Sequence, residues 1–89
     1  MPLHVSRQGL PGSDTAAIYA ACKRQVVQLA RTVPATMVVD FLIPSAITRP
    51  VSNYWDPLHY RVPVAARLMA EIAAASRGQA PPDGRVLLP

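Results

Sequence analysis

Apolar and polar positions of this 89-residue chain follow helical spacing in two long segments. Residues 14–31 carry apolar side chains at three- and four-residue intervals, which predicts a helix with one buried stripe. Ser13 or Asp14 would cap its first turn. A second helix is predicted over residues 63–76, with Pro63 in its first turn. The expected buried faces contain Ala17, Ile18, Ala21, Cys22, Val26, Leu29 and Ala30 in the first helix, and Ala65, Leu68, Met69, Ile72 and Ala73 in the second.

Shorter segments have the pattern of strands. Residues 2–6 (PLHVS) alternate apolar and polar side chains, which predicts a short strand. Residues 37–43 (MVVDFLI) are nearly all apolar, as is typical of a strand covered on both faces in a parallel sheet. A loop of the kind that carries catalytic residues is expected over residues 44–61. The tail, residues 77–89, would hold a terminal strand at RVLL.

The resulting order is strand, helix, strand, long loop and helix, which predicts an α/β fold. A right-handed crossover would join the first two strands in a parallel sheet. Such strands need helices on both faces and neighbours along their edges. We therefore expect residues 1–89 to form a single partial α/β domain, cut from a larger parallel sheet and able to self-associate through its open strand edges.

Composition and charge narrow the classes of function only slightly. With 51% hydrophobic and 16% charged residues, the chain is typical of a folded domain rather than a disordered one. The net charge of +4 suggests nucleic-acid binding as one class of function. The nine Lys and Arg residues are scattered, however, and form no basic run with stacking aromatics, so this class is disfavoured. No apolar run approaches the ~20 residues that span a bilayer, and the first residues lack a signal-peptide pattern. The sequence therefore does not indicate the cellular compartment of the protein.

The candidate catalytic residues are Asp56 and His59, in the stretch SNYWDPLHYR. Aspartate suits the first position of a type I turn and Pro57 the second, so the side chains at the two ends of the turn would approach one another. The Asp56 carboxylate would then accept from Nδ1–H of His59 and leave Nε2 free to take a proton. This is the base and its orienting acid in a Ser-His-Asp site. By spacing alone, a structural Asx-turn with a surface histidine is the simpler interpretation.

Other polar and aromatic residues favour structural roles. We expect neither a cofactor nor a metal site, because His4 and Asp40 are candidates for a third metal ligand by residue type alone. Asp40 is expected at a strand end, where it would accept hydrogen bonds from loop amides. The single cysteine, Cys22, excludes an internal disulfide and is expected to be buried in the helix face. The loop aromatics are expected to pack the loop onto the sheet: Tyr54, Trp55 and Tyr60.

The segment VVDFLIPSAITRPVSNYWDPLHYRVPVAARLMAEIA resembles the C-terminal end of the SGNH (GDSL-like) hydrolase superfamily. There, a hydrophobic strand often ending in Asp leads through a loop to an Asp-x-x-His turn and a final amphipathic helix. The resemblance covers about residues 37–76. It implies a flavodoxin-like three-layer fold, with Asp56 as the orienting acid and His59 as the general base. It also implies metal-free esterase or acyl-transfer chemistry on a carbohydrate or lipid ester.

The other motifs of that family are missing from this chain. The family nucleophile lies in a Gly-Asp-Ser motif, and further blocks supply Gly and Asn to the oxyanion hole. Here Gly12, Ser13 and Asp14 occur in another order, and Ser13 is better explained as a helix cap. We therefore expect the C-terminal part of an SGNH-type serine hydrolase, inactive alone. The alternative is a small non-catalytic α/β interaction module whose open edge recruits a partner strand.

Overall fold

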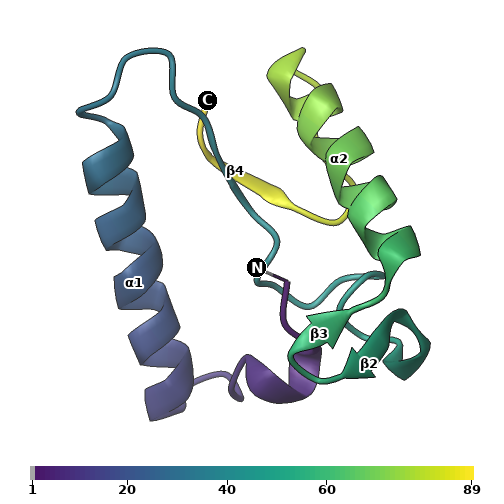
Figure 1. Ribbon diagram of the computed structural model, residues 1–89. Coiled ribbons are helices and arrows are strands. Elements are labelled where there is room, and N and C mark those ends of the chain that lie inside the picture. The colour runs from purple at the N-terminus through teal and green to yellow at the C-terminus, as the bar shows by residue number, and fades with distance from the viewer. Residues whose placement is uncertain (1) are drawn as a thin grey trace.

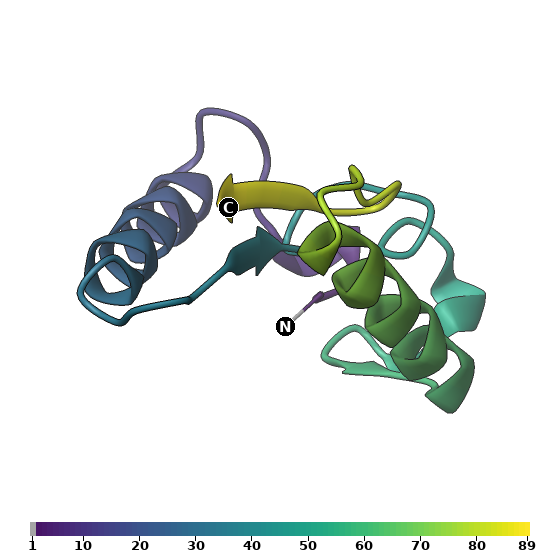
Figure 2. The ribbon, with the colours of Figure 1, turned by 90° about the horizontal axis from the view of Figure 1, so that it is seen from above.

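The computed structural model describes residues 2–89, in which the chain forms two α-helices and two small antiparallel sheets (Figure 1). Helices α1 and α2 stand on opposite sides of the central sheet β1–β4, and the hairpin β2–β3 precedes α2 (Figures 1 and 2). The predicted α/β class is thus confirmed. The bounds are α1 Asp14–Ala30, β1 Val38–Asp40, β2 Tyr54–Asp56, β3 His59–Tyr60, α2 Val62–Ser76 and β4 Arg85–Leu88.

Both predicted helices are present, and their ends follow the expected local chemistry. Ser13 is the N-cap of α1, and its Oγ accepts a hydrogen bond from the backbone N–H of Ala16 at 3.2 Å. Asp14 adds a negative charge to the first turn, where the helix dipole favours it. Pro63 lies in the first turn of α2, where its missing N–H costs no helical hydrogen bond. Gly78 follows this helix with a positive φ of 82°, which favours glycine.

The predicted strand at residues 2–6 and its parallel pairing with residues 37–43 are wrong. Residues Val5–Arg7 form a 3-10 turn, in which His4 Nδ1 accepts the N–H of Ser6 at 3.2 Å. The N–H of Val5 instead donates to the carbonyl of Thr48 at 2.8 Å. This local cap and the bond to the loop outweigh the weak strand pattern of so short a segment.

The strand β1 pairs with the chain's tail instead. It runs antiparallel to β4, with Val39 opposite Val86 and Asp40 opposite Arg85. The terminal strand predicted at RVLL is therefore confirmed, whereas the strand predicted at 37–43 is limited to three residues. The N-terminal segment is therefore not a strand of this sheet, which consists of β1 and β4.

The core is small and lies between α2, the hairpin and the loop after β1. Its buried members are Ile47, Val64 and Leu68, with Phe41 and Tyr60 packed against them. Helix α1 contributes no buried residue. The fold therefore rests mainly on the half of the molecule that contains the hairpin and α2.

Most of the buried stripe predicted for α1 is exposed, because the opposite side of the helix turns toward the sheet. Ile18 and Leu29 are 67% and 70% exposed, and Cys22 is exposed rather than buried. Lys23 holds the helix in this rotation: its Nζ donates to the carbonyl of Leu42 at 2.6 Å and lies 2.8 Å from Asp40 Oδ2. A polar tether has thus decided which face of α1 points inward.

Helix α2 also buries a different face from the one its apolar spacing predicts. Leu68 is buried as expected, but Met69 is 65% exposed and Ile72 lies at the surface. Glu71 takes an inward position, because its Oε1 accepts the backbone N–H of Asp83 at 2.7 Å. The buried positions of this helix are Val64, Leu68, Glu71 and Ala75.

Candidate active site

The β2–β3 hairpin brings Asp56 and His59 together. These residues are opposite one another in the two-stranded ladder, with Pro57 and Leu58 between them. Asp56 Oδ1 accepts the backbone N–H of Leu58 at 2.8 Å, which is the hydrogen bond of an Asx-turn. The turn that the sequence predicts is therefore formed, and it is fixed by contacts within four residues.

The Asp56 carboxylate also contacts the imidazole. Nδ1 of His59 lies 2.9 Å from both Oδ1 and Oδ2 of Asp56. An ionised carboxylate can only accept, so Nδ1 is the donor and Nε2 of a neutral ring is left unprotonated. The hydrogen bond from the Leu58 N–H, followed by that from His59, lowers the pKa of Asp56. The pair has the geometry of a base with its orienting acid, in an Asx-turn.

Solvent reaches both members of the pair. The side chains of His59 and Asp56 are 66% and 54% exposed. Within residues 2–89, no serine hydroxyl forms a hydrogen bond with His59. Ser13, the residue nearest in sequence pattern to the family nucleophile, acts as the helix cap. The described part of the chain therefore places an acid and a base together without a nucleophile.

Aromatic residues of the hairpin divide between core and surface. Tyr54 is 3% exposed and Tyr60 packs against Ile47, Val64 and Leu68, whereas Trp55 is 72% exposed, so its predicted packing is wrong. The guanidinium carbon of Arg61 lies 4.2 Å from the centre of the Trp55 ring, a cation–π contact. Alternation along β2 explains the division, because neighbouring side chains point to opposite faces.

His4 and Asp40 have structural partners. Asp40 Oδ1 accepts the N–H of Leu42 at 2.9 Å, which confirms its predicted role at the end of β1. His4 lies edge-on to Tyr54, with ring centres 5.3 Å apart, and its Nε2 is 3.1 Å from the carbonyl of Arg49. Among the described residues, no group of three or more His, Cys, Asp or Glu side chains is placed to hold a metal ion. No helix in the same range is long and apolar enough to cross a membrane.

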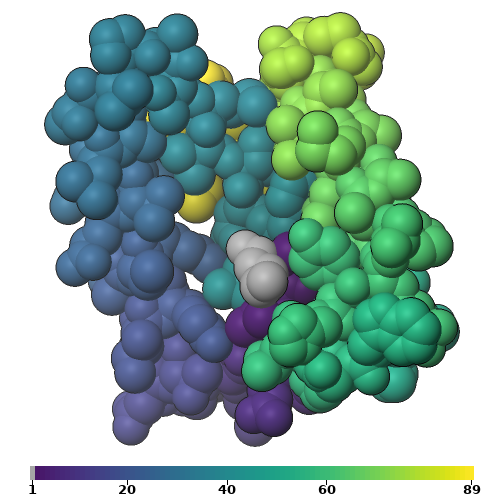
Figure 3. Space-filling view, viewed as in Figure 1, coloured from purple at the N-terminus to yellow at the C-terminus, as the bar shows by residue number. Residues whose placement is uncertain are grey.

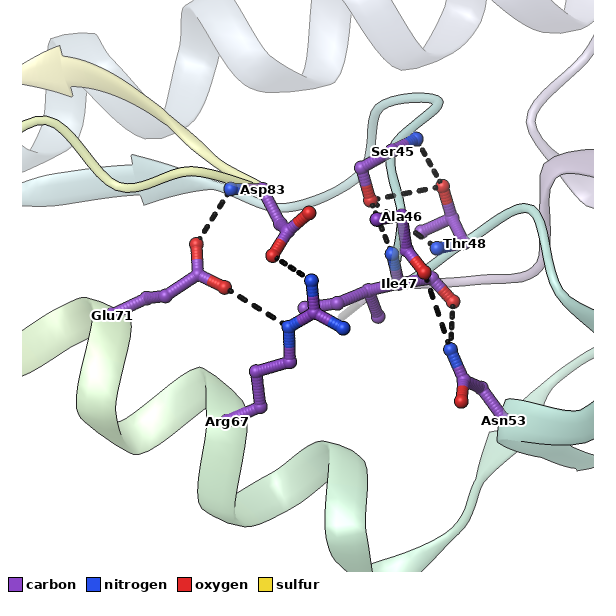
Figure 4. Close-up of polar contacts among 8 residues, drawn as sticks. All are labelled: Ser45, Ala46, Ile47, Thr48, Asn53, Arg67, Glu71 and Asp83. Carbon is purple, nitrogen blue, oxygen red and sulfur yellow. Dashed lines mark hydrogen bonds and ion pairs between the residues drawn. The ribbon is translucent and has the colours of Figure 1, made fainter.

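A cluster of three charged residues, of which Glu71 and Asp83 are buried and Arg67 is exposed, was not predicted from the sequence (Figure 4). Arg67 Nη2 donates to Asp83 Oδ2 at 2.6 Å, and Arg67 Nε lies 3.7 Å from Glu71 Oε2. Burial, and then the neighbouring Asp83, raise the pKa of Glu71. The four-residue spacing of Arg67 and Glu71 is a signal for an ion pair on one helix face, but nothing local marks Asp83 as the third member. This cluster attaches the tail to α2.

Figure 4 also shows how the loop before the hairpin is held. Thr48 Oγ1 accepts the N–H of Ser45 at 2.9 Å, and Asn53 Nδ2 donates to the carbonyl of Ile47 at 2.9 Å. These bonds satisfy backbone groups around the most buried apolar side chain of the core, Ile47. The loop therefore supports the hairpin as a defined structure.

No protein-family model, curated protein or solved structure matches this chain. The relation to SGNH hydrolases therefore stays a prediction from the Asp-x-x-His segment.

Proposed function

We propose that this chain is the C-terminal part of an SGNH-type serine hydrolase and supplies the Asp and His of a Ser-His-Asp triad. The observation that carries the proposal is the 2.9 Å contact between the Asp56 carboxylate and Nδ1 of His59. It supports the roles that the sequence resemblance implies, because the acid occupies one ring nitrogen and leaves the other for a substrate-side proton.

In this proposal Asp56 orients the imidazole and stabilises its protonated form. Nε2 of His59 takes the proton of a serine hydroxyl as the serine oxygen bonds to the acyl carbon of an ester. The same proton passes to the departing alcohol when the ester C–O bond breaks. The lowered pKa of Asp56 keeps the carboxylate ionised at neutral pH. Carbohydrate and lipid esters are the proposed substrates, and a parallel three-layer sheet is the proposed fold of the intact parent.

The serine and the oxyanion-hole donors would come from a further portion of polypeptide. We expect the 89-residue chain alone to hydrolyse p-nitrophenyl acetate no faster than its His59→Ala variant. A chain extended by upstream coding sequence with a Gly-Asp-Ser motif should turn over the ester, and His59→Ala should reduce that turnover by about 10³-fold or more. Turnover by the extended chain that survives His59→Ala would refute the proposed role of His59.

The dyad can be tested separately from turnover. Long-range ¹H–¹⁵N correlation spectra report which ring nitrogen of His59 carries the proton in the neutral form. We expect the Nδ1–H form in the parent chain and a shift toward the Nε2–H form in Asp56→Asn, because the amide no longer offers two carboxylate acceptors. His4 provides the internal control, since its tautomer should be the same in both proteins. An unchanged His59 tautomer would show that Asp56 does not orient the ring.

The open strand edges favour a second candidate, a non-catalytic interaction module. The β1–β4 sheet has two strands, so the outer edge of each offers unpaired backbone groups to a partner strand. This candidate predicts a stable complex between the β1–β4 sheet and a partner strand, and both Asp56→Asn and His59→Ala should leave that complex intact. Loss of the complex in either variant would favour the dyad as the functional site.

A further inference from the structure

A broad groove of about 1010 Å³ separates α1 from the central sheet and the N-terminal segment. Figure 3 shows the surface hollowed between α1 and the strands. Apolar side chains from three elements line it: Val27 of α1, Leu42 and Ile43 after β1, and Leu87 of β4. No residue of the β2–β3 hairpin lines this groove, so it is separate from the candidate active site. We call it the α1–sheet groove.

The charged residues along the α1–sheet groove are almost all cationic. Its single carboxylate, Asp40, is 2.8 Å from Lys23 Nζ and is therefore neutralised by it. Four arginines remain, and none of them forms an ion pair within residues 2–89. They are Arg24 of α1, Arg31 at the C-cap of α1, Arg49 of the loop after β1 and Arg85 of β4.

This combination selects a ligand that is both acidic and apolar. Like charges on the walls of a concave, low-dielectric surface add their fields and attract anions. Guanidinium groups pair with carboxylates through two parallel hydrogen bonds, which an ammonium group cannot form. The floor needs apolar side chains to exclude water from it. Nucleic acid fits less well, because Tyr19 is the single aromatic side chain along the groove and bases bind on stacking platforms.

The dimensions favour a peptide segment. From Ala16 to Arg31 the groove follows α1 for about 22 Å, at the helical rise of ~1.5 Å per residue. An extended strand rises ~3.3 Å per residue, so about seven residues would fill this length. Alternating side chains of a strand point to opposite sides, which would direct carboxylates to the arginines and apolar groups to the floor. We propose that the α1–sheet groove binds an acidic amphipathic peptide segment in extended form.

Binding is tested with fluorescein-labelled octapeptides and the full chain, followed by fluorescence anisotropy. The probe alternates Glu and Leu. An octapeptide of alternating Lys and Leu controls for apolar contact, and octaglutamate controls for charge. We expect the Glu-Leu peptide to bind at least about tenfold more tightly than either control, since each control lacks one of the two interactions. Binding of octaglutamate or of a single-stranded DNA 12-mer as tightly as the Glu-Leu peptide would overturn the proposal.

Charge-matched variants show whether the groove itself is the site. Arg24→Gln with Arg31→Gln removes two cations from α1, and we expect binding to weaken by about tenfold or more. The control is Arg7→Gln with Arg77→Gln, which removes the same charge outside the groove and should change binding less than about twofold. Far-UV circular dichroism checks that both proteins keep their helices. Equal weakening in the two double variants, or no binding of the Glu-Leu peptide by the parent chain, would refute the inference.

Discussion

The hydroxyl of Tyr54 joins the hairpin to the N-terminal segment, and Tyr54→Phe removes that bond without changing the ring. The side chain is 3% exposed, and its hydroxyl donates to the carbonyl of Pro2 at 2.5 Å. Phenylalanine fills the same space, so the substitution leaves no cavity of the kind that accompanies a truncated side chain. Any loss of stability therefore reports the hydrogen bond and its effect on Pro2.

The expected loss is about 1–2 kcal/mol in the free energy of unfolding. A net hydrogen bond is worth roughly 0.5–1.5 kcal/mol, and a buried carbonyl left without a partner adds roughly 1–3 kcal/mol. Pro2 is buried, but the measured contributions of single hydrogen bonds cluster near ~1 kcal/mol, well below the sum of these two contributions. The expected loss in the free energy of unfolding therefore lies in the lower part of the range that the two contributions span together.

Urea denaturation followed by far-UV circular dichroism measures this loss as a lower midpoint at constant slope. Tyr60→Phe is the matched control, because that ring packs against the core and its hydroxyl has no hydrogen-bond partner within residues 2–89. The control should lose less than about 0.5 kcal/mol. Equal losses in the two variants would refute the assignment of stability to the Tyr54 hydroxyl.

The pH dependence of stability tests whether the Tyr54 hydroxyl is buried. Burial raises the pKa of Tyr54 above its usual 10.0. The folded chain therefore holds this proton more tightly than the unfolded chain, because burial disfavours the charged phenolate. The contribution of Tyr54 is complete below pH 10 and is lost as the pH rises through the raised pKa. The stability difference between parent and Tyr54→Phe should shrink over this range, and a constant difference would contradict the reasoning.

Four further substitutions test the packing and the burial of side chains by urea denaturation. Gly84→Ala should destabilise the chain by about 1–3 kcal/mol, because a Cβ there would lie 2.7 Å from the Phe41 ring; an unchanged midpoint would contradict this close approach. Leu68→Ala should cost about 2–4 kcal/mol and Met69→Ala less than about 1 kcal/mol, because these side chains are 7% and 65% exposed; equal losses would favour the face predicted from the sequence. The pKa of Glu71 is raised in the folded chain, so the parent loses stability as the pH rises from 4.5. Glu71→Gln lacks this ionisation and should therefore gain stability relative to the parent over the same range. A stability difference between the two proteins that does not change with pH would refute burial of the charge.

Features fixed by near neighbours were predictable from the sequence. Apolar spacing located both helices, and Ser13 caps the first one as its residue type indicates. The approach of Asp56 and His59 depends on a turn of four residues, so Asp-Pro-Leu-His was enough to predict it. In each case the deciding side-chain hydrogen bonds join residues two or three positions apart.

The tertiary structure alone decided which segments meet. Residues 2–6 and 85–88 were both plausible partners for β1, and the choice of the tail depends on contacts more than 40 residues apart in sequence. Asp83 illustrates the reason: its bonds to Arg67 and Glu71 attach the tail to α2, from which β4 reaches β1. The apolar and polar pattern of the tail does not indicate that Asp83 binds Arg67 and Glu71.

The rotation of each helix about its axis could not be predicted from the sequence either. Periodicity shows that apolar residues share a stripe, but it does not show what lies opposite that stripe. In α1 the side that carries Lys23 and Val27 faces the sheet, where Lys23 pairs with Asp40, and Ile18 is left at the surface. The sequence by itself thus determined the elements and the Asp-His turn, which depend on local hydrogen bonds. The sheet partner, the helix rotations and the α1–sheet groove depend on contacts between residues far apart in the sequence. Only the tertiary structure shows those contacts.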